Sequence, residues 1–149
     1  MKTIRTAGIF LVLTLMFSCE EDAKDFASIV GKWRGTTAEI EVKPFGIPIP
    51  FSKKDESFEA EIEFKSDGTV ILLDDSETRE GTYEVVDGKI ITDLNLSTEF
   101  IDLSGTYTIE TLTTSTLIFY IKKNDTITDP DSGRSISGDI TATLEFERL

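Results

Sequence analysis

The chain has 149 residues, with 28 Asp and Glu against 15 Lys and Arg, a formal net charge of −13, no histidine and one cysteine. A phosphate backbone repels so acidic a protein, because nucleic-acid affinity depends on counterion release by Lys and Arg, and we expect no nucleic-acid partner. Without histidine the chain lacks the usual near-neutral general base and the commonest zinc ligand, and one cysteine cannot form an internal disulfide. Composition therefore favours a non-enzymatic protein with no metal and no cofactor.

The first 18 residues have the layout of a signal peptide. Lys2 and Arg5 precede an apolar run from Ala7 to Phe17. This run is about 11 residues long, whereas a membrane-spanning helix needs roughly 20. We expect residues 1–18 to be cleaved and to take no part in the folded domain.

The end of this run resembles the lipobox of bacterial lipoproteins. Leu15, Ser18 and Cys19 stand where a lipobox has an aliphatic residue, a small residue and the lipidated cysteine. The resemblance implies that Cys19 carries acyl chains such as palmitate and that the protein is an exported outer-membrane lipoprotein. Two or more acyl chains give stable anchoring, so the chemistry of Cys19 would be membrane attachment. Loss of Lys2 and Arg5 would make the mature chain two charges more negative.

Residues 19–28 would form the lipidated cysteine and an acidic tether. Glu20, Glu21 and Asp22 follow Cys19 directly, an arrangement that resembles the surface-export tether of some outer-membrane lipoproteins. The alternative is a merely solvated linker. From Asp25 to Val30, apolar residues at spacings of three and four predict one helical turn that covers the base of the domain.

From residue 29 to the C-terminus the sequence predicts one all-β domain. Apolar and polar residues alternate with period 2 most clearly at 58–64 and 140–146. Other β-rich segments lie at 33–42, 70–73, 82–86, 89–94, 106–113 and 116–122. Turn residues at 66–68 and 87–88 suit tight hairpins between sequence neighbours. This order favours an antiparallel up-and-down barrel of about eight strands over a sandwich.

Three short motifs in this domain suggest a family. Gly31-Lys32-Trp33 resembles the Gly-x-Trp opening of lipocalins, in which the Trp packs across the barrel base. The runs at 64–69 and 81–83 are similar to signatures of the small lipocalin-like lipoproteins of diderm bacteria. The resemblance implies an Arg at the end of the last strand, stacked over that Trp. Arg148 stands there, and its cation–π contact with Trp33 would contribute about 0.5 to 2 kcal/mol; the alternative is a solvated terminal Arg.

The least ordinary stretch lies between residues 43 and 51. Its three prolines predict that it does not pair as a strand, yet Phe45, Ile47, Ile49 and Phe51 are too apolar for a freely solvated loop. One interpretation is a lid over an internal pocket, or a docking surface for a partner. The other is a loop that folds back and fills its own barrel.

The inward side chains of such a barrel are the candidate lining of a ligand pocket. They are expected to include Phe58, Ile62, Phe64, Tyr83, Leu117 and Phe119. A barrel of eight strands is just wide enough either to fill itself or to hold one small ligand. The leading hypothesis is therefore a binding module for a small hydrophobic ligand, and the alternative is a filled barrel that binds another envelope protein through its loops. An internal void of about 300 to 1,000 Å³ would favour the first.

Two acidic segments remain. Asp129, Asp131 and Gly133 partly resemble a calcium loop, but Gly133 stands at the fifth position and Ile140 at the twelfth, where acidic ligands are expected. We expect residues 124–133 to form an exposed hairpin loop without metal, and residues 74–77 to form another acidic turn. No carboxylate has a recognisable partner group, so we assign no catalytic residue.

Overall fold

The computed structural model of the protein describes residues 28–46, 51–74, 77–96, 104–128 and 133–149. These residues form nine strands in one antiparallel sheet. The strands are β1 (Gly31–Pro44), β2 (Phe51–Asp55), β3 (Ala60–Phe64), β4 (Thr69–Asp74), β5 (Glu77–Val86), β6 (Lys89–Thr92), β7 (Gly105–Leu112), β8 (Thr116–Thr128) and β9 (Ser135–Arg148). Across these described ranges there is no helix with the length and apolar character that a membrane crossing requires.

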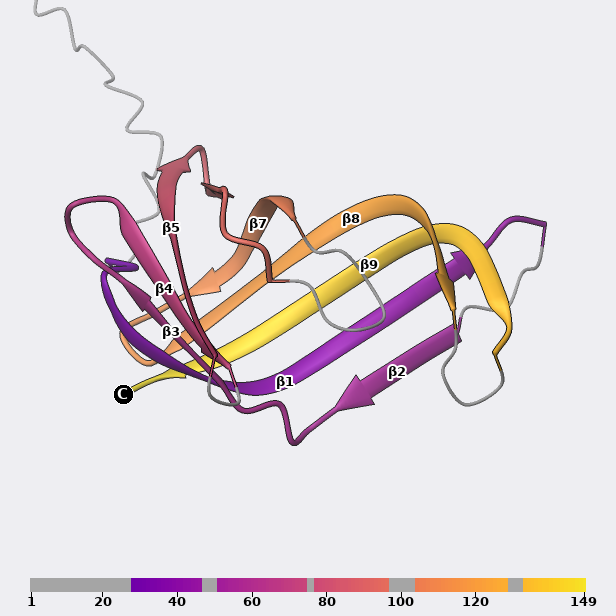
Figure 1. Cartoon of the computed structure of the whole chain (residues 1–149), viewed down its shortest axis with the longest axis horizontal. Coiled ribbons are helices and arrows are strands. Elements are labelled where there is room, and N and C mark those ends of the chain that lie inside the picture. Colours follow the sequence, from indigo (N-terminus) through magenta and orange to yellow (C-terminus); the bar gives the residue numbers. More distant parts are fainter. Residues whose placement is uncertain (1–27, 47–50, 75–76, 97–103, 129–132) are drawn as a thin grey trace, which may run out of the picture.

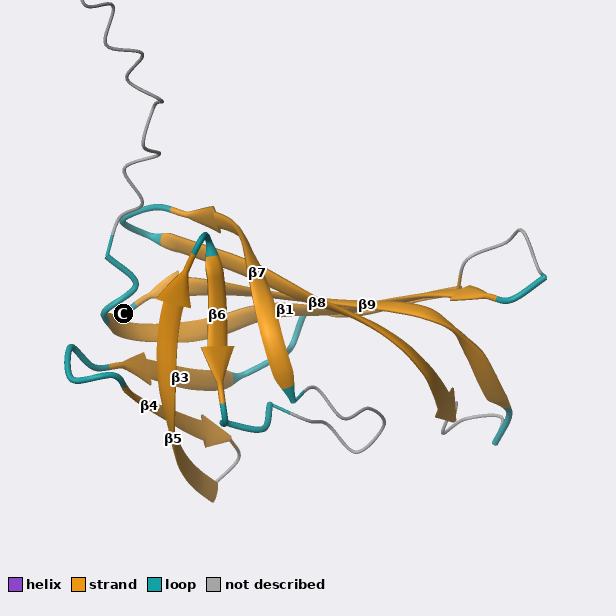
Figure 2. Ribbon diagram, turned by 90° about the horizontal axis from the view of Figure 1, so that it is seen from above, coloured by secondary structure: helices purple, strands orange, loops and turns teal. Residues whose placement is uncertain are grey.

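Eight of the strands close into a barrel. Strand β1 pairs with β3 through Gly31–Arg34 and with β9 from Trp33 onward, so the order β1-β3-β4-β5-β6-β7-β8-β9 returns to β1 (Figures 1 and 2). Strand β2 is the ninth and pairs with β1 alone. Closure removes the unpaired edges of the barrel strands. The predicted all-β, up-and-down barrel of about eight strands is confirmed.

The hairpin turns have the predicted chemistry. Asp87 and Gly88 both have positive φ angles, 50° and 70°, as a two-residue turn between β5 and β6 requires. Gly68, in the turn between β3 and β4, has a φ angle of 85°. These residues therefore fix the twist and register of two barrel hairpins.

Three strands continue beyond the barrel. Strand β3 pairs with only the first four residues of β1, and the ladder between β7 and β8 ends at Tyr120. Farther out, β2, β1, β9 and β8 make a four-stranded ribbon, which we call the sheet extension: residues 38–44, 51–55, 121–128 and 135–142. Figure 2 shows the barrel at one end of the molecule and the extension at the other.

One apolar core runs through both parts, but its composition changes. In the barrel its largest members are the aromatic residues Trp33, Phe64, Tyr107, Phe119 and Phe146. In the extension its members are aliphatic, namely Val42, Ile121, Ile127, Ile140 and Ala142. The alternation that lines the barrel therefore continues as the inner face of the ribbon.

Strands β8 and β9 are longer than the sequence predicted. Strand β8 ends at Thr128 rather than at 122, and β9 begins at Ser135 rather than at 140. The prediction of a loop over 124–133 was therefore wrong for residues 124–128, which pair regularly with β9, and residues 129–132 lie outside the described ranges. One face of the ribbon is open to water, so opposed polar pairs such as Thr126 and Ser137 are compatible with a strand.

The proline-rich stretch was also predicted wrongly at both ends. Pro44 is the last residue of β1, opposite Gly138, and Phe51 begins β2 opposite Val42. A proline is tolerated at a strand end because the ladder needs no N–H donor there. Ile47 and Ile49 lie outside the described residues.

Smaller differences concern three other predictions. Strand β3 begins at Ala60, so Phe58 precedes it. Asp74 ends β4 and pairs with Glu77 at the start of β5, as the two ends of a tight hairpin connection do, and residues 75–76 of the predicted acidic turn lie outside the described ranges. Residues 28–30 are not helical, and the rest of the predicted helical turn lies outside the described residues, as does Cys19.

Candidate functional site

The barrel base brings together the three residues of the predicted motif. Trp33 has no exposed surface, and its Nε1–H donates a hydrogen bond of 2.8 Å to the carbonyl oxygen of Ile29. Antiparallel pairing sets Arg148 opposite Trp33, with the guanidinium carbon 4.2 Å from the centre of the Trp ring. The predicted cation–π contact is therefore confirmed.

Arg148 also holds the chain that enters the barrel. Its Nη1 donates to the carbonyl oxygen of Val30 at 3.0 Å and its Nη2 to that of Ser28 at 2.7 Å. Gly31 has a φ angle of 142°, and a Cβ at this position would lie 2.6 Å from Arg148 Nη1. A glycine before Trp33 therefore makes room for the guanidinium, which gives the Gly-x-Trp pattern a steric reason.

The predicted pocket residues face one another inside the barrel. Ile62, Phe64, Leu117 and Phe119 are buried, with at most 2% of their surface exposed, and Phe58 and Tyr83 pack against them. The six residues therefore belong to one core cluster, as the alternation predicted.

Aromatic rings occupy much of the barrel interior. The ring of Phe119 stacks on that of Phe146 with centres 5.3 Å apart and meets Tyr107 edge-on at 5.1 Å. Phe58 meets Phe146 edge-on at 5.8 Å. Edge-on and offset contacts at these distances stabilise a core beyond area burial. Sequence reasoning did not select Tyr107 or Phe146, although both stand at inward positions of predicted strands.

Tyr83 joins the interior to a barrel turn. Its ring meets Phe64 edge-on at 4.9 Å, and its hydroxyl donates to the carbonyl oxygen of Lys65 at 2.8 Å. Burial raises the pKa of Tyr83 above its ordinary value, and the nearby charge of Asp67 raises it further. Tyr83 therefore stays neutral near pH 7 and acts as a hydrogen-bond donor that holds β5 against the turn after β3.

The described side chains leave little space at the centre of the barrel. A void that these side chains line there has a volume of about 10 Å³, whereas ligand pockets usually measure about 300 to 1,000 Å³. Its lining consists of Ile62, Phe64, Val70, Ile90, Thr92, Leu94, Leu96, Tyr107 and Phe119. Most of these residues are members of the buried core cluster and pack against one another.

The described part of the proline-rich stretch neither fills nor covers this interior. Phe45 is 59% exposed. It follows the end of β1, at the end of the sheet extension that lies away from the barrel (Figure 1). This position suits a contact surface better than a lid.

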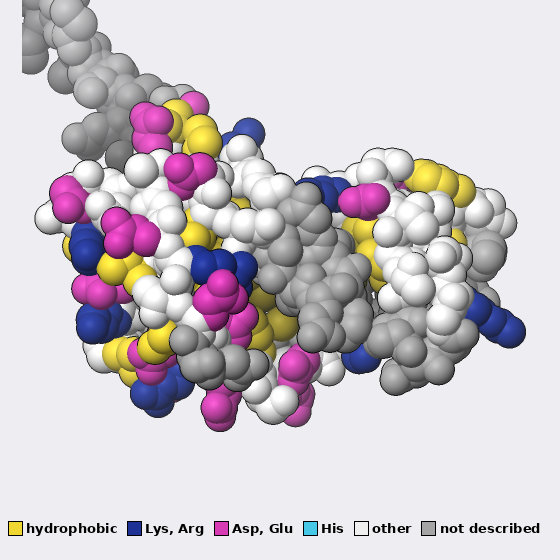
Figure 3. Space-filling view, in the orientation of Figure 1, with side chains coloured by type: hydrophobic (Ala, Val, Ile, Leu, Met, Phe, Trp, Pro, Cys, Tyr) yellow, Lys and Arg dark blue, Asp and Glu magenta, His cyan; other side chains and the backbone are white. Residues whose placement is uncertain are grey.

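Charge is distributed unevenly between the two parts. Acids outnumber bases among the barrel strands, whereas the extension carries both signs equally: Lys43, Lys53, Lys54, Lys122 and Lys123 stand against Glu39, Glu41, Asp55, Asp125 and Asp139. Figure 3 shows acidic side chains over the barrel and mostly uncharged atoms over the visible face of the extension. Within the ranges that the structure describes, no three Asp, Glu, His or Cys side chains gather to hold a metal ion.

The closed barrel, its Trp and Arg base and its continuous apolar interior define a small-barrel binding module, a class that is generally non-enzymatic. Residues 29–145 match the lipocalin-like domain, and the chain belongs to this family. Comparison with curated proteins and with solved structures gives no significant match.

Proposed function

We propose that this protein is a lipid-anchored lipoprotein of the bacterial outer membrane that acts as a non-enzymatic protein-interaction module. The observation that carries the proposal is the closely packed barrel interior, where the void lined by described side chains is about 10 Å³. A small hydrophobic ligand does not fit a space of that size. The binding surface is therefore external, and the partner is another protein of the cell envelope.

The sequence supports the anchor, and the fold is compatible with it. Leu15, Ser18 and Cys19 resemble a lipobox, and Arg148 holds Ser28 at the barrel base. A chain from Cys19 to Ser28 reaches at most about 30 Å when fully extended. The base would therefore lie close to the membrane, with the sheet extension at the opposite end of the molecule.

The first test is native mass spectrometry of the mature protein purified from the membranes of its own host. We expect the mass of the acylated chain from Cys19 onward without any additional ligand. A stoichiometric, non-covalent, lipid-like mass would overturn the filled-barrel proposal and would favour the hydrophobic-ligand carrier.

The second test addresses the anchor alone. Cys19→Ser should abolish palmitate labelling and release the protein from the membrane fraction, because no other cysteine exists. Glu21→Gln, a neutral change in the adjoining tether, is the matched control and should keep both. Retention of the label in Cys19→Ser would contradict the assignment of the lipidation site.

A further inference from the structure

Among the described strands, the outer half of β8 has a partner strand on one side only. The ladder with β7 ends at Tyr120, and no strand of the described ranges pairs with that side of residues 121–128. On its other side this segment pairs with β9 residue by residue, without a bulge. Within this edge the backbone N–H of Thr126 donates to Asp125 Oδ1 at 2.8 Å. The other outward N–H and C=O groups of so regular an edge can pair with another strand.

The sequence of this edge is complementary to itself. Two copies of one strand can pair antiparallel about a two-fold axis that is perpendicular to the sheet. Directly opposed residues then have their side chains on the same face, so the residue on the axis lies opposite its own copy. Each possible register is therefore named by the residue at its centre. A register centred on Asn124 sets Ile121 opposite Ile127 and Lys123 opposite Asp125, each pair occurring twice. It also sets Lys122 opposite Thr126.

The neighbouring registers do not have this property. A register centred on Lys123 places that lysine opposite its own copy, and one centred on Asp125 does the same with a carboxylate. Like charges directly opposite one another destabilise a sheet, whereas opposite charges stabilise it. The charge pattern therefore selects the register centred on Asn124.

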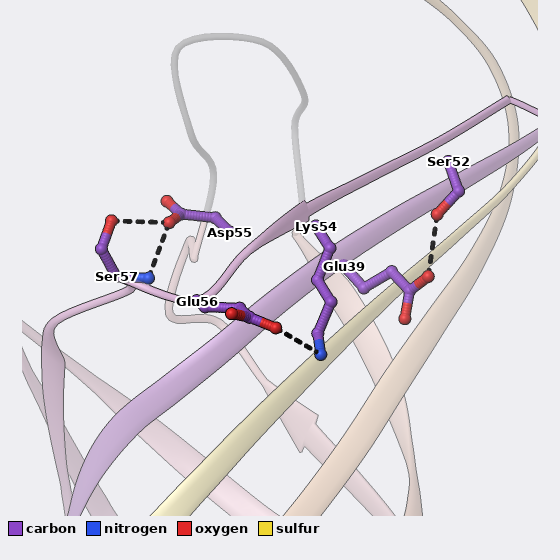
Figure 4. A network of polar contacts seen from close by, with 6 residues as sticks. All are labelled: Glu39, Ser52, Lys54, Asp55, Glu56 and Ser57. Carbon is purple, nitrogen blue, oxygen red and sulfur yellow. Dashed lines mark hydrogen bonds and ion pairs between the residues drawn. The ribbon is translucent and has the colours of Figure 1, made fainter.

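The other edge of the extension lacks this complementarity. Strand β2 has only five residues, and registers centred on Lys53 or Lys54 place a lysine opposite itself. Polar groups of both edges have contacts within the chain. On the β2 edge, Lys54 Nζ lies 3.1 Å from Glu56 and Ser52 donates to Glu39 at 2.8 Å (Figure 4). On the β8 edge, Asn124 donates to Asp139 at 3.1 Å and Lys123 also has a partner in the chain, so length and charge order are what distinguish the two edges. Short, lysine-bearing strands are a usual protection of sheet edges.

The position of the β8 edge also favours self-association. Two chains that each carry a formal charge of −13 repel one another. Positive and negative side chains balance within the extension, so this is the part of the surface where the repulsion is least.

We propose that two copies of this chain pair through residues 121–128 of β8, antiparallel and centred on Asn124, so that their two extensions form one continuous sheet. The occupant of the edge is a second copy of the same chain. The pairing depends neither on the lipid anchor nor on the filled barrel, so its failure would leave the proposed function standing. Because one ladder of eight residues buries less than a standard interface, we expect a weak dimer.

Cysteine cross-linking of the full chain in detergent tests the register. In Asn124→Cys the two new cysteines face each other with Cα atoms about 4.5 to 5.5 Å apart, within disulfide range. In the control Lys122→Cys they lie about 14 Å apart, because the register offsets them by four residues. We expect rapid disulfide dimerisation of Asn124→Cys only. Equal cross-linking rates in the two variants would overturn the proposal. So would a rate in Asn124→Cys no higher than that of the parent chain, which has Cys19 alone.

Charge reversal tests the ion pairs in the Asn124→Cys chain. Lys123→Asp or Asp125→Lys alone replaces two attractive pairs with two repulsive ones, and we expect cross-linking to slow by about tenfold or more. Combining both changes in one chain should restore the rate, and mixing the two single variants should give a heterodimer. Lys54→Asp makes the same charge change on the β2 edge and should have no effect. If the combined variant stays slow, or if the single variants match the parent, the pairing is wrong.

Discussion

The barrel and the sheet extension share strands β1, β8 and β9 but differ in how these strands are paired and covered. In the barrel these strands close against β3 and β7, and aromatic residues such as Phe119 and Phe146 fill the enclosed space. In the extension the same strands carry aliphatic residues such as Val42 and Ile140, and the outer edges are unpaired within the described residues. A barrel must fill a volume, whereas a ribbon needs only one covered face.

This difference separates stability from interaction. Each barrel strand pairs with two other barrel strands, the interior void lined by described side chains is about 10 Å³, and the barrel carries most of the excess negative charge. The extension offers an unpaired edge, balanced charge and the exposed Phe45. The barrel is therefore the stable scaffold, and the extension is the part suited to contact with a partner.

The largest expected effect comes from emptying the barrel. Phe119→Ala removes a ring that contacts both Tyr107 and Phe146, and it should lower the free energy of unfolding by about 3 to 5 kcal/mol. Phe45→Ala removes a ring from the exposed end of the extension and should change this free energy by less than about 0.5 kcal/mol. Urea unfolding followed by Trp33 fluorescence measures both. Similar losses in the two variants would contradict the division into scaffold and contact surface.

Much of the barrel could be predicted from the sequence, because alternation and turn chemistry are local. The Asp87-Gly88 turn and the inward faces of β3 and β9 follow from residues that are close together in the chain. The extension could not be predicted in this way. Period-2 alternation of apolar and polar residues is the same in a barrel and in a ribbon. Only long-range pairing decides where β3 stops pairing with β1 and where β7 stops pairing with β8.

The candidate site divides in the same manner. The contact of Trp33 with Arg148 could be predicted because family resemblance placed both residues at one barrel end, and the register confirms it. The filled interior could not, since the faces of Phe119 and Phe146 follow from alternation but their stacking depends on the register between distant strands. The volume left inside the barrel therefore depends on the pairing of distant strands and could not be predicted from local sequence.

A glycine in the extension gives the next largest effect. A Cβ on Gly138 would collide with the backbone carbonyl of Lys43 and lie 2.9 Å from Pro44 Cα. Gly138→Ala should therefore separate the outer ends of β1 and β9 at a cost of about 1 to 3 kcal/mol. Hydrogen exchange should show faster exchange at Val42 while Trp33 keeps its protection. Ser137→Ala, on the opposite face of β9, should leave both unchanged, and loss of protection throughout the barrel would show that the two parts unfold together.

The barrel base should respond more moderately. Arg148→Ala removes the contact with the Trp33 ring and two hydrogen bonds to backbone carbonyls, and we expect a loss of about 1 to 2 kcal/mol. Trp33 is the only tryptophan in the chain, so its emission should shift as water reaches the ring. Arg148→Lys keeps the charge but loses the planar, forked set of N–H donors, and its free energy of unfolding should lie between those of the parent chain and Arg148→Ala. An unchanged emission maximum in Arg148→Ala would contradict the role of Arg148 at the base.

The smallest expected effect is the pH dependence of stability that single carboxylates of the barrel and of the extension contribute. In the barrel, the backbone N–H groups of Thr82 and Thr69 donate to Asp93 and Asp67, respectively, and lower the pKa of each carboxyl below its usual value. In the extension, the hydroxyl and backbone N–H of Ser57 lower the pKa of Asp55 in the same way. A lowered pKa stabilises the folded state above the pKa of the unfolded chain, near 3.8, and this contribution disappears as the pH falls through the folded value.

Protonation of the many other acids relieves repulsion over the same range, so only differences between variants isolate one group. The Tm of Asp93→Asn should therefore lie below that of the parent at pH 7, and the gap should close as the pH falls below about 3.8. Asp55→Asn should show a smaller gap, because Asp55 ends a strand that is paired on one side only and closes no barrel hairpin. Calorimetric melting between neutral and acid pH measures the gaps, and one that persists in acid would assign the loss to packing rather than to the ionised carboxylate.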